Sequence, residues 1–153
     1  MGRTRRSARR LALDVLYEAE IRDRLPVEAY DARRAEGWVK VAVEDEPPGD
    51  EDPPAEALSY ARSLVEGVQT HQADIDELIV SYADHWALQR MPVVDRNLLR
   101  IGLFELLWGQ GIPVAVAINE AVELAKAMST DDSGRFINGL LGRIVEDRRG
   151  TLG

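Results

Sequence analysis

Residues 129–141, STDDSGRFINGLL, bring polar, basic and aromatic side chains together at the start of a predicted helix. Serine, threonine and aspartate favour helix N-caps, because their side-chain oxygens accept hydrogen bonds from the first backbone N–H groups. We expect a cap at residues 131–133. Capping does not explain Arg135 and Asn138, and Phe136 fits either a core or an exposed position. The backbone N–H groups at a helix start can also hold a phosphate. The stretch therefore predicts a helix cap and leaves a ligand-binding surface open.

A second candidate site is the arginine arm at the N-terminus, RTRRSARR, which carries no acidic residue. Its arginines are Arg3, Arg5, Arg6, Arg9 and Arg10. Guanidinium groups bind phosphates with release of counterions, and they stack on unpaired bases. Positive charge near a helix N-terminus opposes the helix dipole, so capping does not explain the arm. The arm is equally compatible with binding to nucleic acid and with the alternatives, a solubilising tail or a contact to an acidic partner.

Signatures of catalysis are sparse. The two histidines, His71 and His85, lack a metal-ligand spacing, and no glycine-rich loop follows a predicted strand. Glu120 and Glu123 share a helix face and could bind a metal or act as acid and base, but a solvated face is the favoured interpretation. We therefore expect no enzymatic activity, no catalytic residues, no metal site and no cofactor.

The elements that must position these residues are predicted to be helices, because apolar residues recur at helical spacing along most of the chain. Ser7 is the predicted cap of the first helix, and two successive apolar stripes follow residue 55, the second ending at Trp86. Pro92 breaks the pattern, and Pro113 can open a helix at its first turn. Residues 27–43 give a weaker helix, with a short extended piece at 38–43 as the alternative.

These elements predict an all-α fold of about six or seven helices in two small bundles packed together. We expect one domain over residues 1–153. Its N-terminal subdomain covers about 1–88, including an acidic, proline-rich loop at 44–56, and its C-terminal subdomain covers about 92–148.

The formal net charge of -8 is concentrated in that loop. Residues 44–56 hold seven acidic residues and no basic one, and the rest of the chain has 20 acidic against 19 basic residues. A local basic arm can therefore still attract a polyanion. The chain has no cysteine and no apolar run of membrane-spanning length, so we expect a cytoplasmic protein without a membrane segment.

The C-terminal half resembles the NusB family of transcription antitermination factors. The resemblance lies in VVDRNLLRIGLFELL and in IPVAVAINEAVELAKAMSTDDSGRFINGLLGRI, and RRSARRLALDVLYEAE at the N-terminus fits as well. It covers residues 3–24 and 56–146. The family resemblance implies an all-helical fold of two small bundles and no catalysis.

The resemblance also implies partners. Proteins of this family bind the boxA element of single-stranded nascent RNA together with NusE, which is also a protein of the small ribosomal subunit. The complex joins the RNA polymerase antitermination complex and promotes read-through of ribosomal RNA operons. Some members form homodimers, so a homodimer is a further possibility.

The resemblance assigns roles to particular residues. The positions that match the family's RNA-binding residues, besides the arginine arm, are Tyr17, Tyr82, Gln89, Met128, Asp132, Arg135 and Phe136. Asp95 and Glu105 match positions expected to bind the partner protein. Met128 replaces an aromatic residue of some relatives, which puts a stacking contact there in doubt.

Two alternatives remain open at this point. One is a non-catalytic helical protein that self-associates and buries its arm. The other is a stand-alone relative of the RNA-binding domain that some ribosomal RNA cytosine methyltransferases carry.

Overall fold

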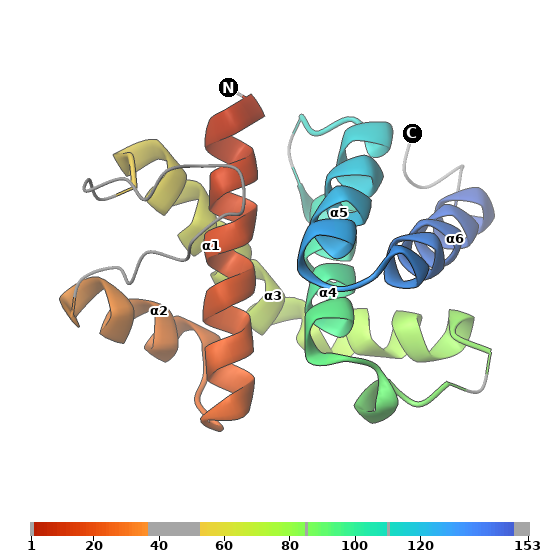
Figure 1. Ribbon diagram of the computed structural model, residues 1–153, viewed down its shortest axis with the longest axis horizontal. Coiled ribbons are helices and arrows are strands. Elements are labelled where there is room, and N and C mark those ends of the chain that lie inside the picture. Colours follow the sequence, from red (N-terminus) through yellow and green to blue (C-terminus); the bar gives the residue numbers. More distant parts are fainter. Residues whose placement is uncertain (1, 37–52, 85, 110, 149–153) are drawn as a thin grey trace. The chain divides into compact units, whose positions relative to one another are not determined.

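The computed structural model describes residues 2–36, 53–84, 86–109 and 111–148, with the side chain of Arg3 outside the described part. Within these ranges the chain forms six α-helices and one short 3-10 helix, η1, and no strand (Figure 1). The elements are α1 (Gly2–Ile21), α2 (Pro26–Glu36), α3 (Ala55–Tyr82), η1 (Leu88–Arg90), α4 (Val93–Trp108), α5 (Val114–Met128) and α6 (Asp131–Asp147). The all-α prediction is confirmed. Most of the acidic loop and the alternative strand at 38–43 lie outside the described residues.

The chain divides into two compact units, residues 1–66 and 67–153. The division falls within α3, whereas the sequence pattern predicts a boundary between residues 88 and 92. Pro92 instead has extended backbone and serves as the N-cap of α4. The two apolar stripes after residue 55, except Trp86 at the end of the second, belong to one helix of 28 residues, because no proline interrupts them.

The N-terminal unit contains α1, α2 and the first part of α3. Helix α1 buries an apolar face that includes Leu13, Val15 and Leu16. A short turn leads into α2, which packs against α1 and buries Tyr30. The hydroxyl of Tyr30 donates a hydrogen bond to the Leu58 carbonyl at 2.9 Å, which ties α2 to α3.

Helix α1 begins at Gly2, so the arginine arm is helical and Ser7 is not its cap. The prediction at Ser7 was wrong because serine also tolerates a helix interior, and arginine and alanine are good helix formers. Its first turn contains no acidic residue. Arg5, Arg6, Arg9 and Arg10 therefore belong to a regular helix, with one to three residues from each arginine to the next.

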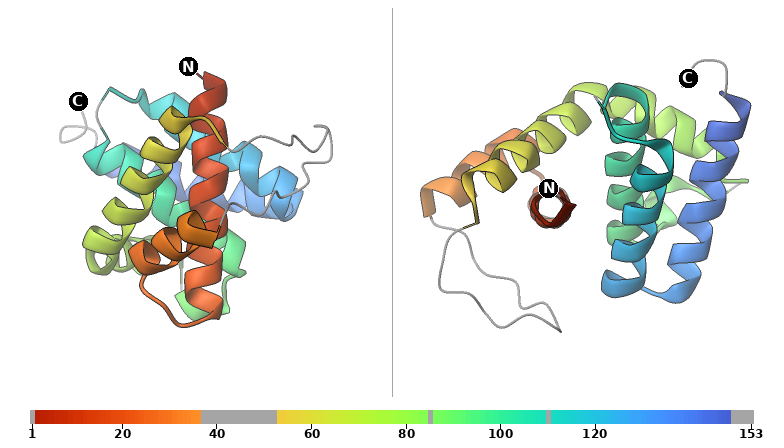
Figure 2. Two further views of the ribbon diagram at one scale, coloured as in Figure 1. Left: turned by 90° about the vertical axis from the view of Figure 1, so that its left-hand side faces the viewer. Right: turned by 90° about the horizontal axis from the view of Figure 1, so that it is seen from above.

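The C-terminal unit is built from the rest of α3 and from η1, α4, α5 and α6. Helix α4 is buried on most of its surface, as its apolar composition predicts, and Leu98, Leu99 and Leu103 are fully buried. Helices α5 and α6 pack side by side, and both contact α4 (Figure 2). Each fully buried leucine or isoleucine contributes about 1.5–3 kcal/mol to folding, so this core determines the stability of the unit.

Two helix starts differ from the sequence prediction in detail. Pro113 is the N-cap of α5 and lies one residue before its first turn. Thr130, rather than a residue of 131–133, caps α6, and its hydroxyl oxygen accepts a hydrogen bond from the Ser133 N–H at 3.0 Å. Five capping-type residues in succession made the choice among them ambiguous.

Candidate nucleic-acid interface

The arginine arm lies in the first half of α1, in the N-terminal unit. The guanidinium groups of Arg5 and Arg9 lie over the ring of Tyr60 in α3, at 5.4 and 6.0 Å from its centroid. The four-residue spacing puts both arginines on one face of α1, which lets a single ring contact both through cation–π interactions. Arg9 is only 2% exposed, whereas Arg6 is exposed. Arg5 and Arg6 therefore offer more accessible charge than Arg9.

Arg10 belongs to an ionic cluster on the α1–α2 side of the unit. Burial raises the pKa of Asp14, and the charges of Arg33 and Arg10 partly offset this effect. Arg33 also pairs with Glu18 at 2.8 Å. Arg10 therefore has an electrostatic role within the fold, in addition to its predicted role toward RNA.

Tyr17 lies further along α1 and is 45% exposed, which is unusual for a large aromatic side chain. An exposed ring on a helix can stack on an unpaired base without any rearrangement of the core. The location of Tyr17 is thus compatible with the role that the family resemblance implies.

The start of α6 presents a second candidate surface, in the C-terminal unit. Asp132 and Arg135 form an ion pair three residues apart, with side chains 86% and 75% exposed. Ser133, between these two residues in the sequence, is buried, and its hydroxyl oxygen lies 3.0 Å from that of Ser129. The buried serine fixes the first turn of the helix, while the charged pair faces solvent.

Phe136 is neither a fully buried core residue nor a fully exposed ring. It is half-buried, and it meets Trp86 edge to face, with ring centroids 4.7 Å apart and planes at 69°. Trp86 is 37% exposed and follows the end of α3. The helical pattern of the sequence includes Trp86 in an apolar stripe and predicts no role for it. No sequence signal marks its position after the helix, because neither proline nor glycine lies between Tyr82 and Trp86.

Asp95 and Glu105, the two predicted partner-binding residues, are each only 2% exposed. Oδ2 of Asp95 accepts a hydrogen bond from the Ser133 hydroxyl at 2.7 Å, and its Oδ1 has no hydrogen-bond partner among the described residues. Asp95 also lies in the first turn of α4, where the helix dipole favours a negative charge. In this structure Asp95 connects the starts of α4 and α6, and its role toward a partner stays a prediction, as does that of Glu105.

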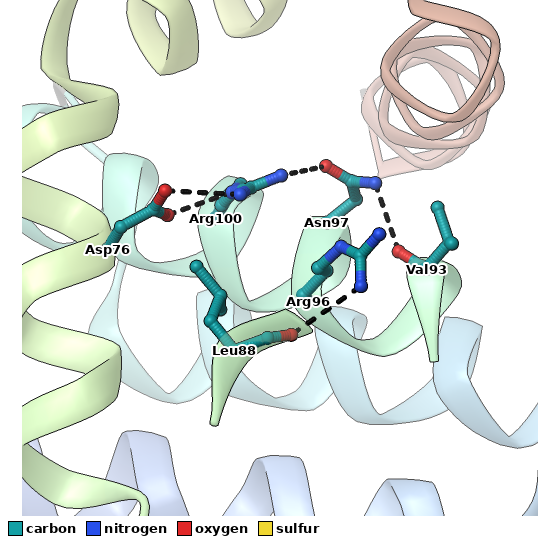
Figure 3. A network of polar contacts seen from close by, with 6 residues as sticks. All are labelled: Asp76, Leu88, Val93, Arg96, Asn97 and Arg100. Carbon is teal, nitrogen blue, oxygen red and sulfur yellow. Dashed lines mark hydrogen bonds and ion pairs between the residues drawn. The ribbon is translucent and has the colours of Figure 1, made fainter. Parts of the chain in front are cut away.

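A polar network holds the segment that follows Trp86 (Figure 3). Arg100 donates to both carboxylate oxygens of Asp76, at 2.9 and 3.1 Å, and to the Asn97 carboxamide at 2.9 Å. Arg96 donates to the Met91 carbonyl at 2.9 Å and lies 3.5 Å from the Leu88 carbonyl. The contacts of Arg96 tie η1, which carries the exposed residue Gln89, to α4, and the contacts of Arg100 with Asp76 tie α4 to α3.

Tyr82 and Met128 occupy different surroundings. The Tyr82 hydroxyl donates to Asp147 of α6 at 2.7 Å, and this hydrogen bond is the main reason why the pKa of Tyr82 is raised. Arg143 binds the Tyr82 carbonyl and pairs with Asp84 at 2.9 Å. Met128 is the half-buried last residue of α5. The structure thus brings Trp86 to Phe136, and it ties Tyr82 to the far end of α6.

Other kinds of site are not found in the described part of the chain. It contains no group of three histidine, cysteine or acidic residues that could hold a metal ion. None of its helices is long and apolar enough to cross a membrane.

Comparisons with known proteins identify relatives over nearly the whole chain. The chain is 55% identical to the transcription antitermination protein NusB of Salinispora arenicola over 142 residues, which is 93% of this chain and 95% of the relative. It is 50% identical to the protein of the same name from Saccharopolyspora erythraea over 152 residues, which is 97% and 93% of the two chains.

Solved structures give the same result. A structure of T. maritima NusB superimposes with a TM-score of 0.77 at 34% identity, covering 94% of this chain and 91% of the other. A crystal structure of the antitermination factors NusB and NusE in complex with double-stranded RNA gives a TM-score of 0.75 at 28% identity, covering 96% and 99%. The family model described as NusB family matches residues 6–146, and the chain belongs to the NusB family.

Proposed function

We propose that this protein is a transcription antitermination factor that binds boxA-type single-stranded RNA together with a NusE-type protein of the small ribosomal subunit. In this role it joins the RNA polymerase antitermination complex and promotes read-through of ribosomal RNA operons. The protein acts by binding and not by catalysis, and it works in the cytoplasm, where bacterial transcription takes place.

The observation that carries this proposal is the accessible positive charge on α1. Within residues 3–10 the helix carries five arginines and no acidic residue, and Arg6 is exposed. Each phosphate that an arginine neutralises releases counterions, which makes binding to RNA favourable and salt-dependent. Charges separated by more than about 10 Å are largely screened at physiological salt, so a phosphate that contacts the arm responds to the charges within that distance and not to the total of -8.

The predicted RNA residues also include groups suited to unpaired bases. Tyr17 is an exposed aromatic residue, and Asp132 and Arg135 supply an acceptor and donors of hydrogen bonds. Such groups recognise bases whose faces and edges are open, as in single strands. The related complex named above contains double-stranded RNA, so the test must compare the two forms of RNA directly.

The proposal is tested by titrating a fluorescently labelled boxA-like RNA of about twelve nucleotides with this protein, with and without the NusE-type partner. A scrambled strand and the same strand annealed to its complement serve as controls. We expect the boxA-like single strand to bind more tightly than either control, and more tightly when the partner is present. The absence of RNA binding at low salt, with the partner present, would contradict the proposal.

A further inference from the structure

The indole of Trp86 is an exposed aromatic surface held on a well-defined backbone. The backbone N–H of Trp86 donates a hydrogen bond to the Ala83 carbonyl at 3.1 Å, beyond the end of α3 at Tyr82. The next residues enter η1, whose carbonyl groups are bound by Arg96. These contacts hold the backbone that carries Trp86, which lowers the entropic cost of ordering this segment when a ligand stacks on the ring.

The contact with Phe136 determines what Trp86 can still bind. In an edge-to-face pair the edge of one ring meets the face of the other, so the pair leaves aromatic surface uncovered. Phe136 is half-buried and Trp86 is 37% exposed, so the larger exposed share belongs to the indole. Phe136 supports the indole from the side of α6.

The charges near this aromatic pair fit a nucleobase better than a phosphate. Asp132 lies four residues before Phe136 on α6, and its ion pair with Arg135 is electrically neutral. Asp131 adds a further negative charge to the same turn, which disfavours an anion. The edge of a base, by contrast, carries both N–H donors and carbonyl acceptors, which match a carboxylate and a guanidinium.

We propose that Trp86 is an RNA-contacting residue whose indole stacks on one unpaired base, with Phe136 as its support. This inference deepens the proposed function and rests on it. The ligand is a base in a single strand, because a base within a duplex has both faces covered by its neighbours. Stacking of one base should contribute about tenfold to affinity.

The first test is tryptophan fluorescence. The chain has three tryptophans, Trp38, Trp86 and Trp108. Replacing Trp38 and Trp108 by phenylalanine leaves Trp86 as the single emitter, and phenylalanine keeps an aromatic ring at position 108, where Trp108 stacks on His71. We expect the boxA-like single strand to quench Trp86 emission and the quenching to saturate together with binding. Saturated RNA binding without quenching would overturn the inference.

The second test is the affinity of a substitution series. We expect Trp86→Leu to weaken binding of the single strand about tenfold, with the salt dependence unchanged, and Trp86→Tyr to restore most of the affinity because it keeps a ring. Trp108→Phe is the matched control and should bind like the wild type. Circular dichroism and thermal unfolding of each variant show whether it is folded, and the quenching experiment does not depend on whether Trp86→Leu folds.

The outcomes separate this inference from the proposed function. If the wild type binds no RNA with the partner present, the proposed function fails, and the role of Trp86 fails with it. If the wild type binds and Trp86→Leu binds equally well, only the inference is overturned. If Trp86→Leu weakens binding only when the partner protein is present, Trp86 is a protein contact, and the inference is likewise overturned.

Discussion

The arginine arm on α1 and the start of α6 are both predicted to bind RNA, but they differ in chemistry. The arm has five basic residues and no acidic one, and two of its guanidinium groups share the ring of Tyr60. The start of α6 has an exposed, neutral ion pair between Asp132 and Arg135 and an aromatic pair. The first surface is suited to phosphates, which are the same in every sequence, and the second to bases. Affinity and sequence preference should therefore depend on different units of the molecule.

The largest effect is expected from reversing charge on the arm. In Arg5→Glu combined with Arg6→Glu, two phosphate contacts are lost. Each contact contributes a slope of about 0.7 to the salt dependence for single strands, which corresponds to roughly fivefold in affinity at 0.1 M salt. We expect at least about a 25-fold loss of RNA affinity at that salt concentration and a slope that is flatter by about 1.4.

A control for this variant lies just beyond the C-terminal end of α1. Arg22 and Arg24 are also exposed, and reversing both changes the net charge by the same amount. RNA affinity measured at four or more salt concentrations should respond to the first pair and not to the second. Equal losses from both pairs would mean that net charge, and not the arm, determines binding.

The next largest effect is expected from the loss of the hydrogen bond between Asp95 of α4 and Ser133 at the start of α6. Replacing Asp95 by alanine removes the acceptor of the buried Ser133 hydroxyl, and we expect a loss of about 1–2 kcal/mol in the free energy of unfolding. Asp95→Asn retains an acceptor oxygen and should lose less. Urea denaturation followed by circular dichroism measures both variants, and an equal loss would show that the hydrogen bond to Ser133 is not what Asp95 contributes.

A smaller effect is expected at Tyr60. Replacing it by leucine removes the ring under Arg5 and Arg9, and each cation–π contact at a partly exposed site is worth about 0.5–1 kcal/mol. Since the ring orders both guanidinium groups, RNA affinity should fall about threefold, whereas Tyr60→Phe should bind like the wild type. If phenylalanine and leucine weaken binding equally, the aromatic ring is not the cause.

The smallest effect is a pH dependence in α1. Burial raises the pKa of Asp14 above its usual value of 3.8, so the folded state holds the proton more tightly than the unfolded state. The resulting stabilisation is complete below about pH 3.8 and is lost as the pH rises through the pKa of the folded state. Asp14→Asn lacks this titration, so its free energy of unfolding relative to the wild type should increase with pH. Denaturation curves at several pH values test this, and a constant difference would contradict it.

The helices could be predicted from the sequence, but the exposure of their side chains could not. Helical periodicity identified the segments around Leu98 and Leu140, because an apolar stripe must face a core. Periodicity could not show that Arg9, Asp95 and Glu105 are buried, since each is a charged residue whose environment depends on distant segments. It also placed Trp86 within a helix, because the helix end at Tyr82 has no proline or glycine to mark it.

The cap of α6 shows the same limit at shorter range. Ser129, Thr130, Asp131, Asp132 and Ser133 are all suitable caps, and local chemistry does not distinguish them. The buried hydrogen bond from Ser133 to Asp95, 38 residues earlier, fixes Ser133 inside the first turn. A contact between two helices thus determines which residue begins α6, and this contact is not visible in the sequence alone.

The two surfaces are expected to divide the work of binding RNA: the arm binds phosphates, and the start of α6 together with Trp86 binds a base. The most direct test is the salt dependence of boxA-like RNA affinity, with the partner present, for three proteins: wild type, Arg5→Glu with Arg6→Glu, and Trp86→Leu. Plotted as the logarithm of affinity against the logarithm of salt concentration, the wild type and Trp86→Leu should give parallel lines offset about tenfold, and the arm variant a flatter line. Equal slopes for all three proteins would contradict this division of roles.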